Sequence, residues 1–269
     1  MPDPRDLVKG QFGAHAQNYV TSADHAQGES LDRMIELVDP QPGWRALDIA
    51  TGGGHTALAF APRVREVVAA DLTAEMLAAA EAFARGRGAA NVTFREADAT
   101  ALPFADGEFD LATCRLAPHH FPDCAQFARE MARVLRRPEP ASGRPGGIAA
   151  MIDNVAPGDA AAARHINALE KLRDPSHNWM YSPGEWEAFF TAAGFKVTHL
   201  ELFRKAMDFE RHCDRMNVPP HIRLQLRAML RHAPAPAAEA LSPIFSADPR
   251  HGPIKFYLGE VLIIGQRSA

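Results

Sequence analysis

Short apolar runs alternate with amphipathic segments over the first two thirds of the chain, and this alternation predicts the fold. The runs have the length of short strands. The segments that follow them carry helix formers and capping residues, and in residues 122–137 apolar positions recur at a spacing near 3.6 residues, which is typical of a helix. Strands that alternate with helices in this way form βαβ units in a parallel sheet. The predicted strands span residues 44–50, 65–71, 91–98, 108–117 and 148–154.

The last third of the chain is less regular. A helix predicted at 182–195 precedes a strand at 196–203, and the chain ends with a long strand at 254–266 that we expect to run antiparallel. The predicted fold class is therefore α/β: a Rossmann-like, doubly wound sheet of seven strands, mostly parallel with one antiparallel strand.

The length and composition fit one large soluble domain. The chain has 269 residues, of which 46% are hydrophobic and 23% are charged. These values are ordinary for a globular protein with a sizeable core. We expect a single domain over residues 1–269, with a helical lid at 1–40 and a helical insertion between the last two strands at 203–250.

The charge balance argues against a general binder of nucleic acid or membranes. The formal net charge is −4, and no apolar run approaches the ~20 residues needed to cross a bilayer. The basic segment 203–232 holds seven Lys and Arg against three Asp and Glu. It is typical of a solvated helix face, and the alternative is a patch that contacts phosphates, as in a nucleic-acid methyltransferase. We expect no nucleic-acid partner and no membrane span.

Cysteine usage and the N-terminal pattern indicate a cytoplasmic protein. Cys114, Cys124 and Cys213 are widely spaced and form no C-x-x-C pair, which fits a reducing compartment and offers neither a disulfide framework nor a zinc site. The N-terminal stretch lacks the apolar segment of a secretory signal. The expected oligomeric state is a monomer or a homodimer.

Three consecutive glycines, Gly52, Gly53 and Gly54, separate the first predicted strand from the helix after it. A strand, a glycine turn and a helix offer backbone amides and the positive end of a helix to a ligand. The spacing Gly52-x-Gly54-x-x-Ala57 also matches the dinucleotide fingerprint, so the turn alone is compatible with an NAD(P)-binding oxidoreductase. A tight turn without a ligand is the remaining alternative.

Acidic residues at the ends of the predicted strands favour a ligand other than NAD(P) at this turn. Asp48 lies just before the glycine turn, where its charge disfavours a pyrophosphate and suits a ligand with an ammonium group. Asp71 ends the second strand, the position of a carboxylate that holds ribose hydroxyls. Asp98 ends the third strand and can accept a hydrogen bond from an exocyclic amine such as that of adenine. These acidic residues disfavour NAD as the ligand. The sequence also shows no second dinucleotide-binding half after the first, which disfavours NAD as well.

Taken together, the segments LDIATGGG, AADLT, EADATALPF and EFDLATCRLAPHHF resemble the motifs of class I S-adenosylmethionine-dependent methyltransferases. The resemblance covers residues 10–155 and is closest to the branch with ubiquinone and menaquinone C-methyltransferases and their uncharacterised bacterial relatives. Two positions depart from the family pattern. Ala50 stands where the family has a glycine, and a short L-(K/R)-P-G-G turn is expanded to residues 135–147, a loop expected to be disordered or to reshape the rear of the site.

The resemblance implies S-adenosyl-L-methionine as the cofactor. The first strand and the glycine turn would surround its amino-acid end, and residues after the next two strands would bind its ribose and adenine. Arg115 would line the cofactor or, alternatively, form a surface salt bridge, and Tyr19 with Phe12 would belong to the lid or pack in the core. The implied cofactor-binding residues are Tyr19, Asp48, Ala50, Gly52, Gly54, Asp71, Leu72, Asp98, Ala99 and Arg115.

The implied reaction is methyl transfer to a small-molecule acceptor by direct displacement at a carbon bound to positively charged sulfur. In such a reaction the protein mainly aligns the reactants and excludes water, although many acceptors also need a base. His119 and His120 follow the fourth strand, toward the expected acceptor pocket, and are the predicted catalytic residues. The alternative is that they cap the next helix or bond to the backbone. The segment 173–181 is a candidate specificity loop.

No catalytic metal is expected. Metal-dependent methyl transfer would need an acidic cluster near the fourth and fifth strands. Asp153 ends the fifth strand, but Arg115 and two histidines follow the fourth. His119, His120 and Asp123 form a weaker candidate set, because adjacent histidines rarely bind one metal together.

Overall fold

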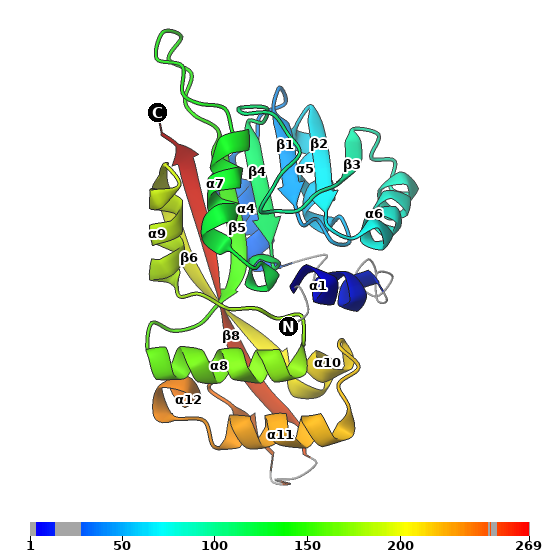
Figure 1. Cartoon of the computed structure of the whole chain (residues 1–269), viewed down its shortest axis with the longest axis vertical. Coiled ribbons are helices and arrows are strands. Elements are labelled where there is room, and N and C mark those ends of the chain that lie inside the picture. Colours follow the sequence, from blue (N-terminus) through cyan, green and yellow to red (C-terminus); the bar gives the residue numbers. More distant parts are fainter. Residues whose placement is uncertain (1–3, 14–27, 247, 249–251, 269) are drawn as a thin grey trace.

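A seven-stranded sheet forms the centre of the molecule, and a short eighth strand pairs with it (Figure 1). The structure is a computed structural model that describes residues 4–13, 28–246, 248 and 252–268. The strand order is β3-β2-β1-β4-β5-β8-β6, and β8 runs antiparallel to β5, β6 and β7 while the other pairings are parallel. The strands are β1 (Arg45–Ile49), β2 (Glu66–Asp71), β3 (Val92–Glu96), β4 (Leu111–Arg115), β5 (Ile148–Val155), β6 (Phe195–Asp208), β7 (Ile244–Phe245) and β8 (Ile254–Arg267).

The predicted α/β fold and its antiparallel strand, β8, are confirmed, but the number of strands is eight rather than seven. The additional strand, β7, has two residues, too few for a hydrophobic pattern to reveal. β6 continues to Asp208, beyond the predicted end at 203, because it stays paired with β8 along its length.

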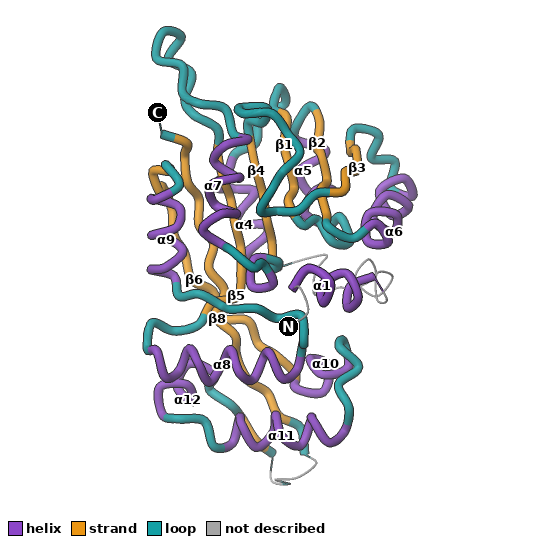
Figure 2. Tube along the Cα trace, in the orientation of Figure 1, coloured by secondary structure: helices purple, strands orange, loops and turns teal. Residues whose placement is uncertain are grey.

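Helices cover both faces of the sheet, since alternate residues of its strands point to opposite sides (Figure 2). On β1, Leu47 and Ile49 belong to a core with α7 and α9, whereas Ala46 belongs to the core on the other face with α4 and α5. The helices beside the sheet are α4 (Glu29–Val38), α5 (His55–Phe60), α6 (Ala74–Gly86), α7 (Cys124–Val134) and α9 (Pro183–Ala192), with the 3₁₀ turns η1 (Ala61–Arg63) and η2 (Pro118–His120).

A helical lobe is attached to one end of the sheet. β6 and β8 have 14 residues each and extend past the other strands to support it (Figures 1 and 2). Met207, Phe256 and Leu258 from these extensions join the lobe's own hydrophobic core. The helices of the lobe are α8 (Ala160–Arg173), α10 (Phe209–Asp214), α11 (Pro220–Arg231) and α12 (Ala235–Leu241).

Two described helices fall within the expected N-terminal lid, and they lie in different places. α1 (Pro4–Gly13) lies near the carboxyl ends of the parallel strands, between the sheet and the helical lobe, and contacts α6 (Figure 1). α4 instead packs Met34 and Val38 into the core on one face of the sheet. Of these two helices, only α1 is placed to cover a ligand. No helix in the described ranges is long and apolar enough to cross a membrane.

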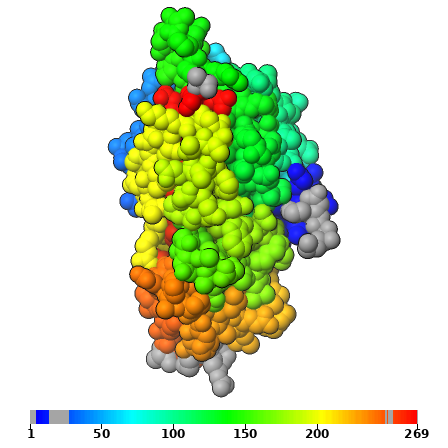
Figure 3. Space-filling view, turned by 60° about the vertical axis from the view of Figure 1, so that its left-hand side comes forward, coloured from blue at the N-terminus to red at the C-terminus, as the bar shows by residue number. Residues whose placement is uncertain are grey.

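The expanded loop 135–147 projects from the molecule at the end away from the helical lobe (Figures 1 and 3). Arg136 and Arg144 both bond to Asp110 Oδ1, at 2.6 and 2.8 Å, and fix the base of this loop. The expectation that the loop reshapes the site is wrong, because it joins α7 to the start of β5 and its residues line neither of the cavities described below.

Candidate active site

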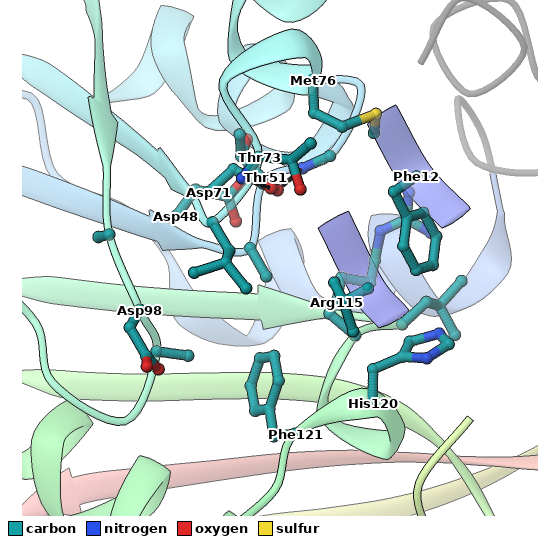
Figure 4. Close-up of a pocket in the computed structure, with 18 of the residues that line it drawn as sticks. Phe12, Asp48, Thr51, Asp71, Thr73, Met76, Asp98, Arg115, His120 and Phe121 are labelled. Atoms are coloured by element: carbon teal, nitrogen blue, oxygen red, sulfur yellow. Dashed lines mark hydrogen bonds between the residues drawn. The ribbon is translucent and has the colours of Figure 1, made fainter. Parts of the chain in front are cut away.

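A cavity opens at the carboxyl ends of β1, β2 and β4, the edge where ligands of open α/β sheets bind (Figure 4). It encloses about 1050 Å³ of empty space, counted with its opening to solvent, which is enough for a nucleoside-sized ligand. Most of the cofactor-binding residues that the sequence predicts come together in its wall. These are Asp48, Ala50, Gly52, Asp71, Leu72, Asp98, Ala99 and Arg115.

The glycine turn forms one side of this cavity. Ala50 and Gly52 both adopt left-handed backbone, with φ of 53° and 54°. Gly54 begins α5 with φ of 81°, and a Cβ there would lie 3.3 Å from the Cβ of Ala80 on α6. Gly53 lines the cavity and Gly54 does not, the reverse of the expected assignment, because Gly54 is required for packing against α6.

Asp48 is a buried carboxylate at the end of β1. Its Oδ2 accepts a hydrogen bond from Thr51 Oγ1 at 2.6 Å, and its Oδ1 accepts one from Thr113 Oγ1 at 2.7 Å. Burial raises the pKa of Asp48 to about 6, although the two threonines and the charge of Arg115 lower it. A cation bound beside this group would stabilise its charged form, so the position suits an ammonium group.

Asp71 organises the turn from the neighbouring strand. Its Oδ2 accepts a hydrogen bond from the amide of Gly52 at 2.9 Å, and its Oδ1 accepts one from the amide of Thr73 at 3.0 Å. Burial raises the pKa of Asp71 even though these bonds favour the charged form. Each carboxylate oxygen retains a lone pair that can accept a ribose hydroxyl.

Asp98 lies across the cavity from Phe12 and His120 (Figure 4). Its Oδ1 accepts hydrogen bonds from the amide and hydroxyl of Thr100, both at 2.7 Å, and its Oδ2 accepts one from Arg5 Nε at 2.6 Å. Burial alone would raise the pKa of Asp98, but Thr100 and Arg5 lower it below the ordinary value. Nothing in the sequence pattern indicated Arg5, because its place beside Asp98 depends on how α1 packs.

Arg115 lines the first cavity. It is half-buried, and its Nε donates a hydrogen bond to Thr56 Oγ1 at 3.1 Å. Phe12, on α1, meets the ring of His120 edge-on with centroids 5.0 Å apart. Tyr19 lies outside the described residues, so its contact with the cofactor stays a prediction.

A second cavity adjoins the first, and Phe12, Leu116 and His120 line both. It lies between the ends of β4 and β5 and the helical lobe. Its remaining lining residues, many of them charged, are His119, Asn154, Glu170, Arg173, Asp174, Lys205, Met207, His212, Arg215, Met216 and Leu258. The two cavities are thus adjacent and share part of their walls.

His119, which lines the second cavity, pairs with a buried carboxylate. Its Nδ1 lies 2.6 Å from Oδ1 of Asp153, which is completely buried. Burial lowers the pKa of His119, but the charge and hydrogen bond of Asp153 outweigh this effect and the pKa is raised. From its place in the sequence, Asp153 was a candidate only for a metal site. The contact arises because β4 and β5 are paired neighbours, which brings the residues at their ends together.

His120 has a different environment, although its ring centroid is only 4.2 Å from that of His119. Its Nδ1 faces the carbonyl oxygen and the hydroxyl of Ser176, at 3.1 and 3.2 Å. Burial and the charge of His119 lower the pKa of His120 to about 3. This geometry matches the alternative of a histidine bonded to the backbone.

The part of the lobe next to the second cavity is held by buried charges. Glu170 on α8 accepts hydrogen bonds from Arg173 at 2.8 Å and from His212 on α10 at 2.9 Å. Burial would raise the pKa of Glu170, but Arg173 and His212 hold it well below the ordinary value. The same burial lowers the pKa of His212 to about 4.

The weaker metal set that includes Asp123 does not assemble. Asp123 accepts a hydrogen bond from the amide of Gln126 at 2.8 Å and caps α7. Within the described ranges, no group of three or more His, Cys, Asp or Glu side chains is arranged to hold a metal ion.

Comparison with known proteins decides the family. A family model described as a methyltransferase domain matches residues 47–138, the part of the chain that carries most of the first cavity. The uncharacterized methyltransferase YcgJ of Bacillus subtilis (strain 168) is 35% identical over 254 residues, which cover 94% of this chain and 96% of YcgJ. The chain belongs to the methyltransferase family. The glycine turn is therefore that of a methyltransferase, and the alternative of an NAD(P)-binding oxidoreductase is wrong.

Solved structures agree with this methyltransferase assignment. The crystal structure of YcgJ has a TM-score of 0.83 at 35% identity and covers 89% of this chain and 98% of its own. A putative methyltransferase from Bacillus halodurans C-125 has a TM-score of 0.82 at 34% identity and covers 90% of this chain and 100% of its own.

Cations of the basic segment 203–232 of this methyltransferase form ion pairs within the helical lobe. Arg223 bonds to Glu210 and Asp214 at 2.8 and 2.7 Å, and Arg227 also bonds to Glu210. Two of the seven cations of this segment are thus paired within the lobe.

Proposed function

We propose that this methyltransferase uses S-adenosyl-L-methionine to methylate a small-molecule acceptor by direct displacement. The observation that carries the proposal is the meeting of Asp48, Asp71 and Asp98 with the glycine turn in one cavity, which continues past Phe12 and His120 into a second cavity. The first cavity would hold the cofactor, and the second would hold the acceptor. We expect the protein to work in the cytoplasm as one domain.

The residues of the first cavity fit this cofactor from end to end. Asp48 and the amides of the glycine turn suit its amino-acid end, because a buried carboxylate favours the ammonium group. Asp71 has lone pairs for the ribose hydroxyls, and Asp98 can accept a bond from the adenine amine beside Leu72 and Ala99. When bound, the cofactor supplies a methyl group already activated by a sulfonium centre.

The protein's part in the reaction is mainly to align the two ligands and exclude water. α1 supports this role, since Val8 and Phe12 line the first cavity and Arg5 ties the helix to Asp98. Phe12 also lines the second cavity, so it would lie where the two ligands meet. α1 thus forms the part of the proposed lid that the structure describes.

Calorimetric titration with S-adenosylmethionine, S-adenosylhomocysteine and NAD tests the proposal. We expect both sulfur nucleosides to bind and NAD not to bind. Asp71→Asn should weaken both by about 10- to 100-fold, because it removes a charged acceptor that is buried at the site. Glu66→Gln, at the half-buried start of the same strand, is the matched control and should bind normally. Tight NAD binding without a response to either sulfur nucleoside would contradict the proposal.

A further inference from the structure

We propose that His119 is the general base for the acceptor, that Asp153 positions it, and that the acceptor is a hydroxyl compound or an enolisable carbon acid rather than a neutral amine. This inference rests on the proposed function and specifies the chemistry of its second cavity. It separates the two adjacent histidines, of which only His119 is held by a carboxylate.

The geometry of Asp153 supports its assignment as a positioning residue. Its Oδ1 holds Nδ1 of His119 at 2.6 Å, and within the described part of the chain its buried Oδ2 has no hydrogen-bond partner. A carboxylate that is buried with so few partners is costly unless its neighbour carries positive charge. Asp153 therefore stabilises the imidazolium that His119 becomes when it takes up a proton.

The hydrogen bond to Asp153 also fixes the tautomer. With Nδ1–H donated to Asp153, the neutral ring presents the lone pair of Nε2. The ring of His119 lines the second cavity, and no hydrogen bond to its Nε2 is found among the described residues. Nε2 is thus the atom of this pair that a bound acceptor can reach.

His120 lacks the features of a base. Its Nδ1 faces Ser176, and Ser176 Oγ donates in turn to Asp174 Oδ1 at 2.6 Å. The neighbouring charge of His119 opposes a second positive charge 4.2 Å away. His120 therefore stays neutral and serves as a wall between the two cavities, where Phe12 packs against its ring.

The proposed step balances in protons and electrons. The O–H or C–H bond of the acceptor breaks, its proton goes to His119 Nε2, and its electron pair forms the new bond to the methyl carbon. The bond from that carbon to sulfur breaks, and its electron pair stays on sulfur, which becomes neutral. The imidazolium later releases its proton to solvent. A neutral amine would attack with its own lone pair and would not need this base.

Charged and titratable groups from several elements surround His119, and together they determine its pH response. Negative groups lie on β5, near the end of α8 and just after it, and positive or titratable groups come from η2, α8, the loop after α8, β6, α10 and the residue that follows α10. They are Asp153, Glu170, Asp174, His120, His177, Arg173, Lys205, His212 and Arg215. The net effect raises the pKa of His119, so the base becomes neutral, and the reaction faster, as the pH rises through a value above its ordinary 6.5.

Nuclear magnetic resonance of ¹⁵N-histidine-labelled protein tests the pair without an acceptor. His119→Gln identifies the signal of His119. In the wild-type protein this signal should titrate above about 6.5, and in Asp153→Asn it should titrate below about 6.5, because burial remains while the charge is lost. His120 should stay neutral above pH 5 in both proteins. A midpoint for His119 that does not move in Asp153→Asn would overturn the pairing.

Product formation tests the acceptor class, with a panel of phenols, β-diketones and aliphatic amines and with S-adenosylhomocysteine release as the signal. We expect turnover of phenols or β-diketones, reduced about 10²- to 10⁴-fold in His119→Gln and less in the matched variant His120→Gln. Asp153→Asn should also move the pH profile, a change that a purely structural residue would not cause. Turnover of amines alone, or of none of the phenols and diketones, would overturn the inference. Calorimetric binding of S-adenosylmethionine separates this failure from failure of the proposed function, and it also shows that each variant is folded.

Discussion

Arg5 Nε lies 2.6 Å from Asp98 Oδ2, so the first helix of the chain is bonded directly to the carboxylate expected to bind adenine. This relationship makes α1 part of the proposed cofactor site. It also leaves Asp98 with only part of its hydrogen-bonding capacity for a ligand, since Thr100 occupies its other oxygen.

Removing Asp98 should therefore weaken cofactor binding more than removing Arg5. For Asp98→Ala we expect a loss of about 10-fold or more in affinity for S-adenosylhomocysteine, measured by calorimetry, because a charge-assisted hydrogen bond is lost. Arg5→Ala should cost about fivefold or less, since the Arg5 side chain is 40% exposed and such pairs contribute little. Lys9, on the same helix as Arg5, forms a more exposed pair with Glu96 of β3, and Lys9→Ala is therefore the control. A larger effect of Arg5→Ala would contradict this ranking.

Cofactor affinity should fall as the pH is lowered through about 6, because the pKa of Asp48 is raised to about 6 and its neutral form does not attract an ammonium group. Asp48→Asn should bind about 10-fold more weakly at pH 7.5 and lose this pH dependence. Asp32→Asn, at an exposed carboxylate of α4, should retain it.

The stability of the free protein should respond to Asp48 in the opposite direction. A carboxyl group whose pKa is higher in the folded state than in the unfolded state favours folding more strongly as the pH falls from about 6 toward about 4. Urea unfolding of the wild type and of Asp48→Asn over this range measures the effect. If affinity and stability change in the same direction, the assignment to Asp48 is wrong.

Ala50→Gly should stabilise the protein by about 1 kcal/mol. Ala50 has a φ of 53°, a left-handed conformation that costs a residue with a Cβ about 1–2 kcal/mol and glycine much less, and the greater freedom of glycine in the unfolded chain offsets part of this gain. The expected rise in Tm by thermal unfolding is about 2–4 °C. Ala112→Gly, in the middle of β4, is the control and should lower Tm.

Glu170→Ala should destabilise the protein by about 3–5 kcal/mol, because it leaves the buried charge of Arg173 without its nearest carboxylate. The pKa of Glu170 is held well below its ordinary value, so its contribution is present above about pH 4 and is lost as the pH falls. Urea unfolding at pH 7 and pH 3 should show a smaller acid effect in Glu170→Gln than in the wild type. Glu187→Ala, at an exposed position of α9, should change neither value.

The sequence predicted the first cavity well, because its residues follow one another closely at the ends of consecutive strands. Asp48, Asp71 and Asp98 each lie within two residues of the carboxyl end of a strand, and parallel strands bring such ends to one edge of the sheet. Which of Gly53 and Gly54 lines the cavity could not be predicted from the sequence, because it depends on the Cβ of Ala80, which belongs to the next helix.

Most of the second cavity could not be predicted from the sequence. Its charged residues come from α8, β6 and α10 or follow these helices directly, and no local pattern predicts how these elements meet. The pair of His119 and Asp153 spans two strands, so it depends on strand order rather than on spacing along the chain. His119 could be predicted as a site residue because it follows the end of a strand closely. Its pairing with Asp153 could not be predicted, because it depends on β4 and β5 being neighbours.

The length of β6 and β8 has a consequence for how the sequences of such enzymes can diverge. These two strands carry a helical lobe with a hydrophobic core of its own, and the lobe supplies much of the wall of the second cavity. Substitutions that accumulate in α8 and α10 can therefore reshape the acceptor's surroundings while the glycine turn and its three carboxylates stay as they are. If the first cavity binds the methyl donor and the second binds the acceptor, as we propose, the residues around the two ligands can change independently of each other.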